Sequence, residues 1–151
     1  MEAAVENKTI VNTTRFGQVE IDPDRVVTLV APLWGFPHAT RFFLQKHSNK
    51  SPLMWLQSLD DPGLAFVVSP PSVVSQGYKP EVNDGVKSEL MIGNDREMDI
   101  LLILTVPGGR PQDMTANLLA PVVINVKKRL ARQVLLDPNR YDPCHPVFER
   151  H

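Results

Sequence analysis

The sequence predicts a mainly β protein, a small antiparallel β-barrel-like domain with one short helix. Fourteen prolines separate short runs of β-branched and aromatic residues, a pattern typical of strands joined by tight turns. Apolar residues at sustained helical spacing are hard to find outside one stretch. Many short strands without intervening helices indicate a closed or nearly closed barrel or sandwich, because closure removes unpaired strand edges.

The expected strands follow one another closely along the chain. Each is a short run rich in β-branched, aromatic or leucine side chains and bounded by turn-forming residues. In chain order they are 9–12, 17–21, 26–30, 41–45, 53–58, 65–69, 99–106, 121–126 and 132–136. The single helix is expected over 84–92, where Val86, Leu90 and Met91 share one face and Gly93 closes the C-terminus.

The length and composition fit one domain. A chain of 151 residues with 42% apolar content can bury a core without a metal or a disulfide. We expect residues 1–137 to form the barrel domain and residues 138–151 to form an extended or disordered C-terminal tail, since Pro143 and Pro146 disfavour regular structure. The single cysteine, Cys144, cannot form an internal disulfide.

The overall charge argues for a protein partner. The 16 basic and 17 acidic residues nearly cancel, which argues against direct nucleic-acid binding through a broad basic face. The first residues have neither a basic leader nor an apolar stretch, so we expect a cytoplasmic protein. The densest apolar run, 100–104, is much shorter than the roughly 20 residues of a membrane helix, and no membrane association is expected.

Charge is nevertheless distributed unevenly along the chain. Residues 80–99 contain six acids and two bases, a balance of −4, and residues 127–140 contain five bases and one acid, a balance of +4. Such segregation can steer a charged partner. Solvated surface charge is the more ordinary interpretation, since surface charges usually serve solubility.

The sequence offers few groups for catalysis or metal binding. Asp60 and Asp61 precede Pro62-Gly63 and indicate first a turn, because Asp side chains bind the following backbone amides. Asp142, Cys144 and His145 have no second ligand pair at zinc-like spacing. We therefore expect no catalytic residues, no metal and no cofactor.

Two segments combine polar and apolar residues in a way that a plain strand does not require. In 54–62 and 114–124, Gln57 and Asn117 stand beside large apolar residues. A core tolerates such amides only when they are hydrogen-bonded. They either brace loops by binding backbone or belong to a recognition surface.

Five segments in collinear order resemble the FliW family of bacterial flagellar assembly factors. They are Thr14–Gly17 (TRFG), Met54–Val68 (MWLQSLDDPGLAFVV), Leu104–Pro107 (LTVP), Met114–Asn125 (MTANLLAPVVIN) and Arg132–Val134 (RQV). The resemblance implies a small β-barrel-like fold and a protein that is not an enzyme. It implies binding to the carbon-storage regulator CsrA, which represses flagellin translation, and to flagellin, which displaces the regulator.

The resemblance also suggests residues of interest. The motif positions include Phe16, Trp55, Gln57, Phe66, Asn117, Leu118 and Gln133, of which Trp55, Phe66 and Leu118 are expected in the core. The chain departs from the family at Pro32-Leu33-Trp34-Gly35-Phe36, where Gly-Leu-Pro-Gly-Phe is usual. Trp34 is there either an exposed anchor or buried against the barrel.

Partner-binding residues can be named as candidates from these observations. They are Trp34, Asp60, Asp61, Glu81, Asp84, Glu89 and Asn117. The alternative function is a small-ligand-binding or catalytic β-barrel, which would need a concave pocket with converging polar groups. A third possibility is a divergent member that kept flagellin binding and lost the regulator.

Overall fold

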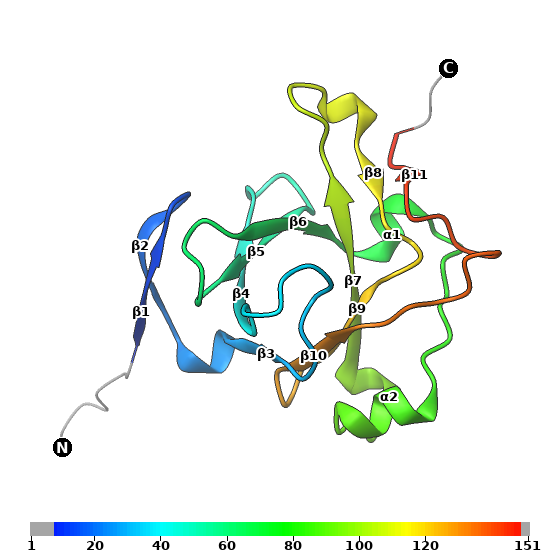
Figure 1. The fold of residues 1–151 in the computed structure, drawn as a ribbon, viewed down its shortest axis with the longest axis horizontal. Helices are drawn as coiled ribbons and strands as arrows, with labels where there is room; N and C mark the ends of the chain where they lie inside the picture. The colour runs from blue at the N-terminus through cyan, green and yellow to red at the C-terminus, as the bar shows by residue number, and fades with distance from the viewer. Residues whose placement is uncertain (1–7, 149–151) are drawn as a thin grey trace.

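Seven strands close into a barrel in the structure, a computed structural model that describes residues 8–148 (Figure 1). Around the barrel the order is β7-β6-β5-β4-β3-β10-β9, and β9 pairs with β7 to complete the circle. The strands are β3 (Val27–Leu29), β4 (Arg41–Lys46), β5 (Met54–Ser58), β6 (Ala65–Ser69), β7 (Met98–Thr105), β9 (Val122–Asn125) and β10 (Leu130–Gln133). The β3–β10 pairing is parallel and the other barrel pairings are antiparallel.

The barrel interior is filled by apolar side chains. Alternate residues of a strand point to opposite faces, and one set from each strand meets inside. Phe42, Leu56, Val68 and Leu101 belong to this central cluster and are almost fully buried. The barrel interior is therefore packed like a protein core.

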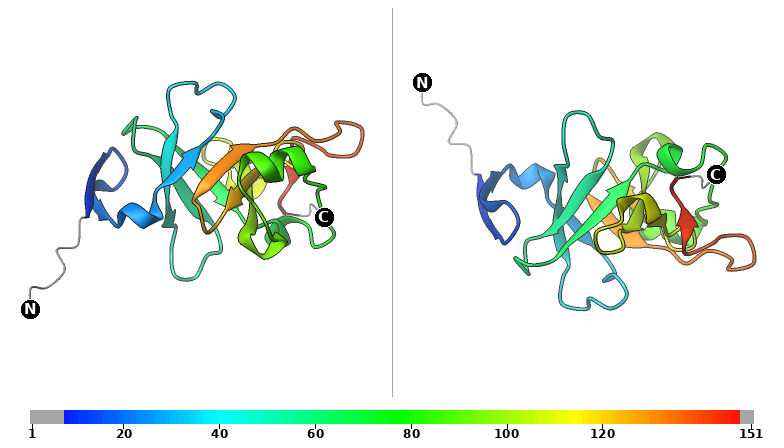
Figure 2. Two further views of the ribbon diagram at one scale, coloured as in Figure 1. Left: turned by 90° about the horizontal axis from the view of Figure 1, so that it is seen from below. Right: turned by 90° about the horizontal axis from the view of Figure 1, so that it is seen from above.

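Three smaller layers cover the outside of the barrel (Figure 2). The hairpin of β1 (Thr9–Thr13) and β2 (Gly17–Ile21) packs on Phe43 of β4. Helix α2 (Asp84–Glu89) packs through Val86 and Leu90 on Val123 of β9. Strands β8 (Thr115–Ala116) and β11 (His145–Pro146) extend the sheet beside β7, and helix α1 (Pro71–Val74) packs on the same apolar cluster through Val74. The 3₁₀ turns are η1 (Pro23–Arg25), η2 (Asp95–Glu97) and η3 (Pro111–Asp113).

The predicted fold class is confirmed, and the element boundaries need several corrections. All nine expected strands are present, but β10 begins at Leu130 and ends at Gln133, so the expected range 132–136 was shifted. Strands β8 and β11 were missed because two-residue strands are too short to show alternation. The expectation of one helix was also wrong, since α1 forms a second, single turn.

The end of α2 differs from the expectation based on Gly93. Met91 adopts the left-handed conformation with φ 59°, and Ile92 donates from its amide to the Lys87 carbonyl at 2.8 Å. This is the hydrogen bond of a Schellman motif, in which the residue at Met91 reverses the chain. Met91 is 58% exposed whereas Val86 and Leu90 are buried, so the expectation that Met91 shares their face was wrong.

Residues 138–148 are held against the rest of the fold. Tyr141 packs edge-to-face on Tyr78 with ring centroids 5.5 Å apart, and Leu118 donates from its amide to the Asp142 carbonyl. The Tyr78 hydroxyl donates to the Leu118 carbonyl at 2.8 Å, and burial followed by the neighbouring Tyr141 raises the pKa of Tyr78. The part of the expected tail at 149–151 lies outside the described residues.

One buried amide joins α2 to the β9–β10 hairpin. The Nδ2 of Asn125 donates to the carbonyls of Leu90 and Met91 at 2.8 and 3.2 Å. Its Oδ1 accepts from the amides of Lys127 and Lys128, both at 3.0 Å. Asn125 thus satisfies the free carbonyls at the end of the helix and the first amides of the hairpin turn. No helix within residues 8–148 is long and apolar enough to cross a membrane.

We expect Asn125→Ala to lower the free energy of unfolding by roughly 2–4 kcal/mol, because it leaves buried donors and acceptors on two elements without partners. Urea denaturation followed by circular dichroism measures this loss. The matched control is Asn94→Ala, which removes one exposed capping bond to the Arg96 amide and should cost less. Equal losses for the two variants would contradict this role of Asn125.

Candidate functional site

Two side chains stabilise the turn after β5, namely Ser58 at the end of the strand and Asp61 in the turn itself. The buried Ser58 hydroxyl accepts from the amides of Asp60 and Asp61 at 3.0 and 2.9 Å. The Asp61 carboxylate accepts from the Gly63 amide at 3.0 Å. The expected turn role is therefore confirmed for Asp61, whose side chain binds a following amide, whereas Asp60 takes part in the turn through its own backbone amide.

Asp60 also binds the start of β4. Its Oδ1 accepts from Nε and Nη2 of Arg41 at 3.2 and 2.9 Å, and its Oδ2 accepts from the amides of Thr40 and Arg41 at 3.1 and 3.0 Å. Burial alone would raise the pKa of Asp60, but the Arg41 side chain and the two amides outweigh it and hold the pKa below its usual value. Asp60 is therefore ionised at neutral pH, with both carboxylate oxygens occupied.

A fully buried amide supports the same turn from below. The Nε2 of Gln57 lies 3.0–3.2 Å from the carbonyls of Ser58, Pro62 and Leu64, and its Oε1 is buried without a hydrogen-bond partner among the described residues. The loop-bracing interpretation of Gln57 is confirmed. Asn117 acts in the same way, since its Oδ1 accepts from the amides of Leu119 and Ala120 at 3.0 Å.

The loop between β3 and β4 lies at the same end of the barrel. Leu33 is buried, and Phe36 donates from its amide to the Leu33 carbonyl at 2.9 Å. Gly35 has φ 91°, which fits the third position of a type II turn. The Trp34 side chain is 55% exposed, which answers the open question in favour of an exposed residue.

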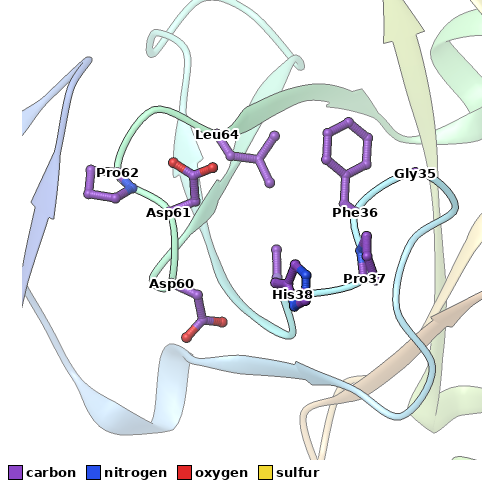
Figure 3. Close-up of a pocket in the computed structure, with 9 residues that line it drawn as sticks. Gly35, Phe36, Pro37, His38, Asp60, Asp61, Pro62 and Leu64 are labelled. Carbon is purple, nitrogen blue, oxygen red and sulfur yellow. The ribbon is translucent and has the colours of Figure 1, made fainter.

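A groove of about 390 Å³ separates this loop from the Asp60 turn. Figure 3 shows Phe36 and His38 on one side of it and Asp60, Asp61 and Pro62 on the other. Phe36 packs edge-to-face on Phe66 at 5.0 Å. The groove thus combines an apolar side with a rim of carboxylates, an arrangement that suits a partner side chain or loop.

The predicted partner-binding residues fall in three places. Trp34, Asp60 and Asp61 gather at one end of the barrel, although Trp34 does not line the groove. Glu81, Asp84 and Glu89 lie on and before α2, on the outer wall of the barrel. Asn117 lies in the connection between β8 and β9. The structure therefore brings together the first group and keeps the other two apart from it.

The acidic stretch is partly neutralised by its neighbours. Arg132 of β10 binds Glu89 at 2.6 Å, and Lys87 binds Asp95 at 3.0 Å. The oppositely charged segments 80–99 and 127–140 thus meet through the Arg132–Glu89 pair. Glu81 and Asp84 are exposed and lie outside these two pairs.

Some residues at the groove were not identified from the sequence. Arg41 neutralises Asp60 across 19 positions of the chain, and no local pattern indicates this pairing. For Phe36 and Leu64, the sequence offers one indication of a role at the groove, since each is a large apolar residue in a turn-rich segment. Of the motif residues expected in the core, Leu118 is buried, whereas Trp55 is half-buried under the Arg15 guanidinium, 4.0 Å from the ring centroid.

The C-terminal Asp142 and Cys144 take part in a local turn. The Asp142 carboxylate accepts from the Cys144 amide at 2.8 Å. Within the described part of the chain, no three His, Cys, Asp or Glu side chains are grouped closely enough to hold a metal ion.

Comparisons with known proteins identify the family of this chain and agree with its barrel fold. The family model described as "FliW protein" matches residues 9–147. The flagellar assembly factor FliW of Thermosipho africanus is 32% identical over 90% of this chain and 94% of its own length. The FliW of Syntrophus aciditrophicus is 37% identical over 92% and 87%. A crystal structure of the flagellar assembly factor FliW superposes with a TM-score of 0.85 at 32% identity and covers 94% of this chain and 99% of that one. The chain therefore belongs to the FliW family.

Proposed function

We propose that this protein is a cytoplasmic flagellar assembly factor that binds the translational regulator CsrA and relieves its repression of flagellin synthesis. Flagellin is the competing partner, so free flagellin releases the regulator and limits its own synthesis. Family membership over residues 9–147 is the observation that carries this proposal. The curated relatives are named as assembly factors and not as enzymes, which supports a role through protein contact.

The arrangement of the barrel supports a binding role on its outer surface. Phe42, Leu56 and Val68 fill the interior, so a partner must contact the loops or the outer wall. The groove beside Phe36 and Asp60 offers one such place at the end of the barrel. Exposed tryptophan is a frequent anchor in protein interfaces, and Trp34 lies on the loop that borders this groove.

The alternative of a small-ligand-binding or catalytic barrel has one supporting observation, the groove itself. Its aspartates are a poor fit to catalysis, because both oxygens of Asp60 are engaged with Arg41 and backbone amides. Asp61 binds the Gly63 amide and serves the turn. We therefore favour the protein-binding function, with a flagellin-only member of the family as the remaining variant.

The purified protein should form a complex with the CsrA of its own organism without nucleic acid. Its near-neutral charge argues against direct binding of RNA, so RNA is not expected to link the two proteins. A pull-down after nuclease treatment, followed by size-exclusion chromatography, measures this complex. Absence of a complex at micromolar concentrations between two well-folded proteins would remove the regulator role.

Flagellin should displace CsrA from the complex, because the two partners compete in the proposed feedback. Adding monomeric flagellin to the preformed complex and following the released CsrA by analytical chromatography tests this step. Simultaneous binding of both partners with unchanged affinities would contradict the feedback and leave two independent binding activities.

The double variant Glu81→Lys with Asp84→Lys should slow association with CsrA and weaken its salt dependence. An RNA-binding regulator is basic, and complementary charge mainly accelerates encounter. Glu89 stays unchanged because Arg132 holds it. Stopped-flow association at two salt concentrations gives the rates, and circular dichroism confirms folding.

The matched control is Glu20→Lys with Asp24→Lys, two exposed acids on β2 and η1. It changes the net charge by the same amount at another place. Equal rates for the two double variants would show that the acids before α2 have no special role in docking.

A further inference from the structure

The hairpin at the N-terminal end of the fold leaves one strand edge open. Within the described chain, β1 pairs with β2 alone. A groove of about 360 Å³ follows the other side of β1, lined by Thr9 to Asn12 and, across from them, by Arg41, Leu59, Asp60 and Pro62. We call the side of β1 that faces this groove the β1 edge.

The backbone groups of two residues point toward this groove. Thr14, directly after β1, donates from its amide to the Pro62 carbonyl at 2.9 Å, so its N–H points away from β2. Backbone groups on one side of a strand recur at every second residue. The N–H and C=O of Asn12 and Ile10 therefore point the same way, and within residues 8–148 neither residue makes a backbone hydrogen bond outside the hairpin.

The β1 edge also lacks the usual protection of an exposed strand. Natural edges carry charged residues, prolines or bulges that prevent pairing with other chains. The sequence of β1 is Thr-Ile-Val-Asn-Thr, with no charge and no proline. Its register with β2 is continuous over all five residues, and the Ile10 side chain is 57% exposed. Among residues 8–148, the backbone groups on the side of β1 that faces the groove pair with no other strand.

We infer that the β1 edge binds an extended segment of a protein partner, which adds a strand next to Ile10 and Asn12. Strand addition gives affinity through main-chain hydrogen bonds and specificity through alternate side chains. The Pro62 carbonyl already accepts the hydrogen bond of the Thr14 amide on this side of the hairpin. The added strand would bind the next backbone groups along the same side, those of Asn12 and Ile10. This inference rests on the proposed function, because it places one of the two partners named there.

The opposite wall of the groove indicates the chemistry of the bound segment. Arg41 and Asp60 neutralise each other through two side-chain hydrogen bonds, and Leu59 and Pro62 supply apolar surface. A wall without net charge suits an uncharged segment, with β-branched or apolar side chains at alternate positions.

The test is Ile10→Pro, which removes one N–H from the β1 edge and is compatible with an edge strand. Its matched control is Glu20→Pro, which removes an N–H from the opposite edge of the same hairpin, since Glu20 is the partner of Ile10 in the register. Ile10→Thr controls for the side chain. Purified CsrA and monomeric flagellin are the probes, with affinities measured by titration calorimetry and folding checked by thermal denaturation.

We expect Ile10→Pro to weaken binding of one partner by roughly fivefold or more relative to Glu20→Pro, the effect of a net hydrogen bond, whereas Ile10→Thr should keep most of the affinity. Smaller differences for both partners would overturn the inference and leave the proposed function intact. If the unmodified protein binds neither partner, the proposed function fails and this inference fails with it.

Two further outcomes are decisive. A wild-type dimer in sedimentation that becomes monomeric in Ile10→Pro would identify a second copy of the chain as the occupant and overturn the inference. Should Ile10→Pro fail to fold, amide exchange of the wild-type protein decides instead. Slower exchange at Ile10 and Asn12 in the complex supports strand addition, and unchanged exchange overturns it.

Discussion

The fold depends on the pairing of β7 with β9, because this ladder closes the barrel. Met98 to Leu101 of β7 pair with Asn125 to Val122 of β9 in antiparallel register. The following residues of β7 pair with β6 on one side and with β8 on the other. One strand thus closes the barrel and carries the additional sheet of β8 and β11. Closure hides the strand edges and lets Leu101 and Val122 face the common interior.

Local sequence patterns were sufficient to predict the positions of the strands. They were insufficient to predict which strands pair with one another. Strands β2 and β6 have the expected bounds, because Gly17 and Ser69 mark clear changes in pattern. Closure through β7 and β9 and the parallel β3–β10 pair are set by packing between distant segments. The end of α2 was misplaced for the same reason, since Asn125 binds the Met91 carbonyl from another element and favours the reversal there.

The candidate site was predicted in part. The turn at Asp60 was evident from its composition, and so was the exposed Trp34 as one of two options. The pairing of Asp60 with Arg41 and the groove next to Phe36 exist only once β4 and β5 are adjacent. Gln57 is buried and Asn117 is half-buried, and both side chains brace loops through backbone hydrogen bonds. These bonds identify no partner contact by themselves.

Closure also determines where recognition can occur. A closed barrel with a filled interior has no free backbone edge on its wall, so its neighbours must contact side chains. The β1–β2 hairpin lies outside this circle and keeps main-chain groups available beside Asp60. Asp60 itself lines both this groove and the groove next to Phe36. The Asp60–Arg41 pair therefore separates two adjoining surfaces, one that presents side chains and one that presents backbone. A partner that spans both surfaces would contact the same turn on its two sides. Arg41 holds the Asp60 carboxylate of this turn ionised and in place.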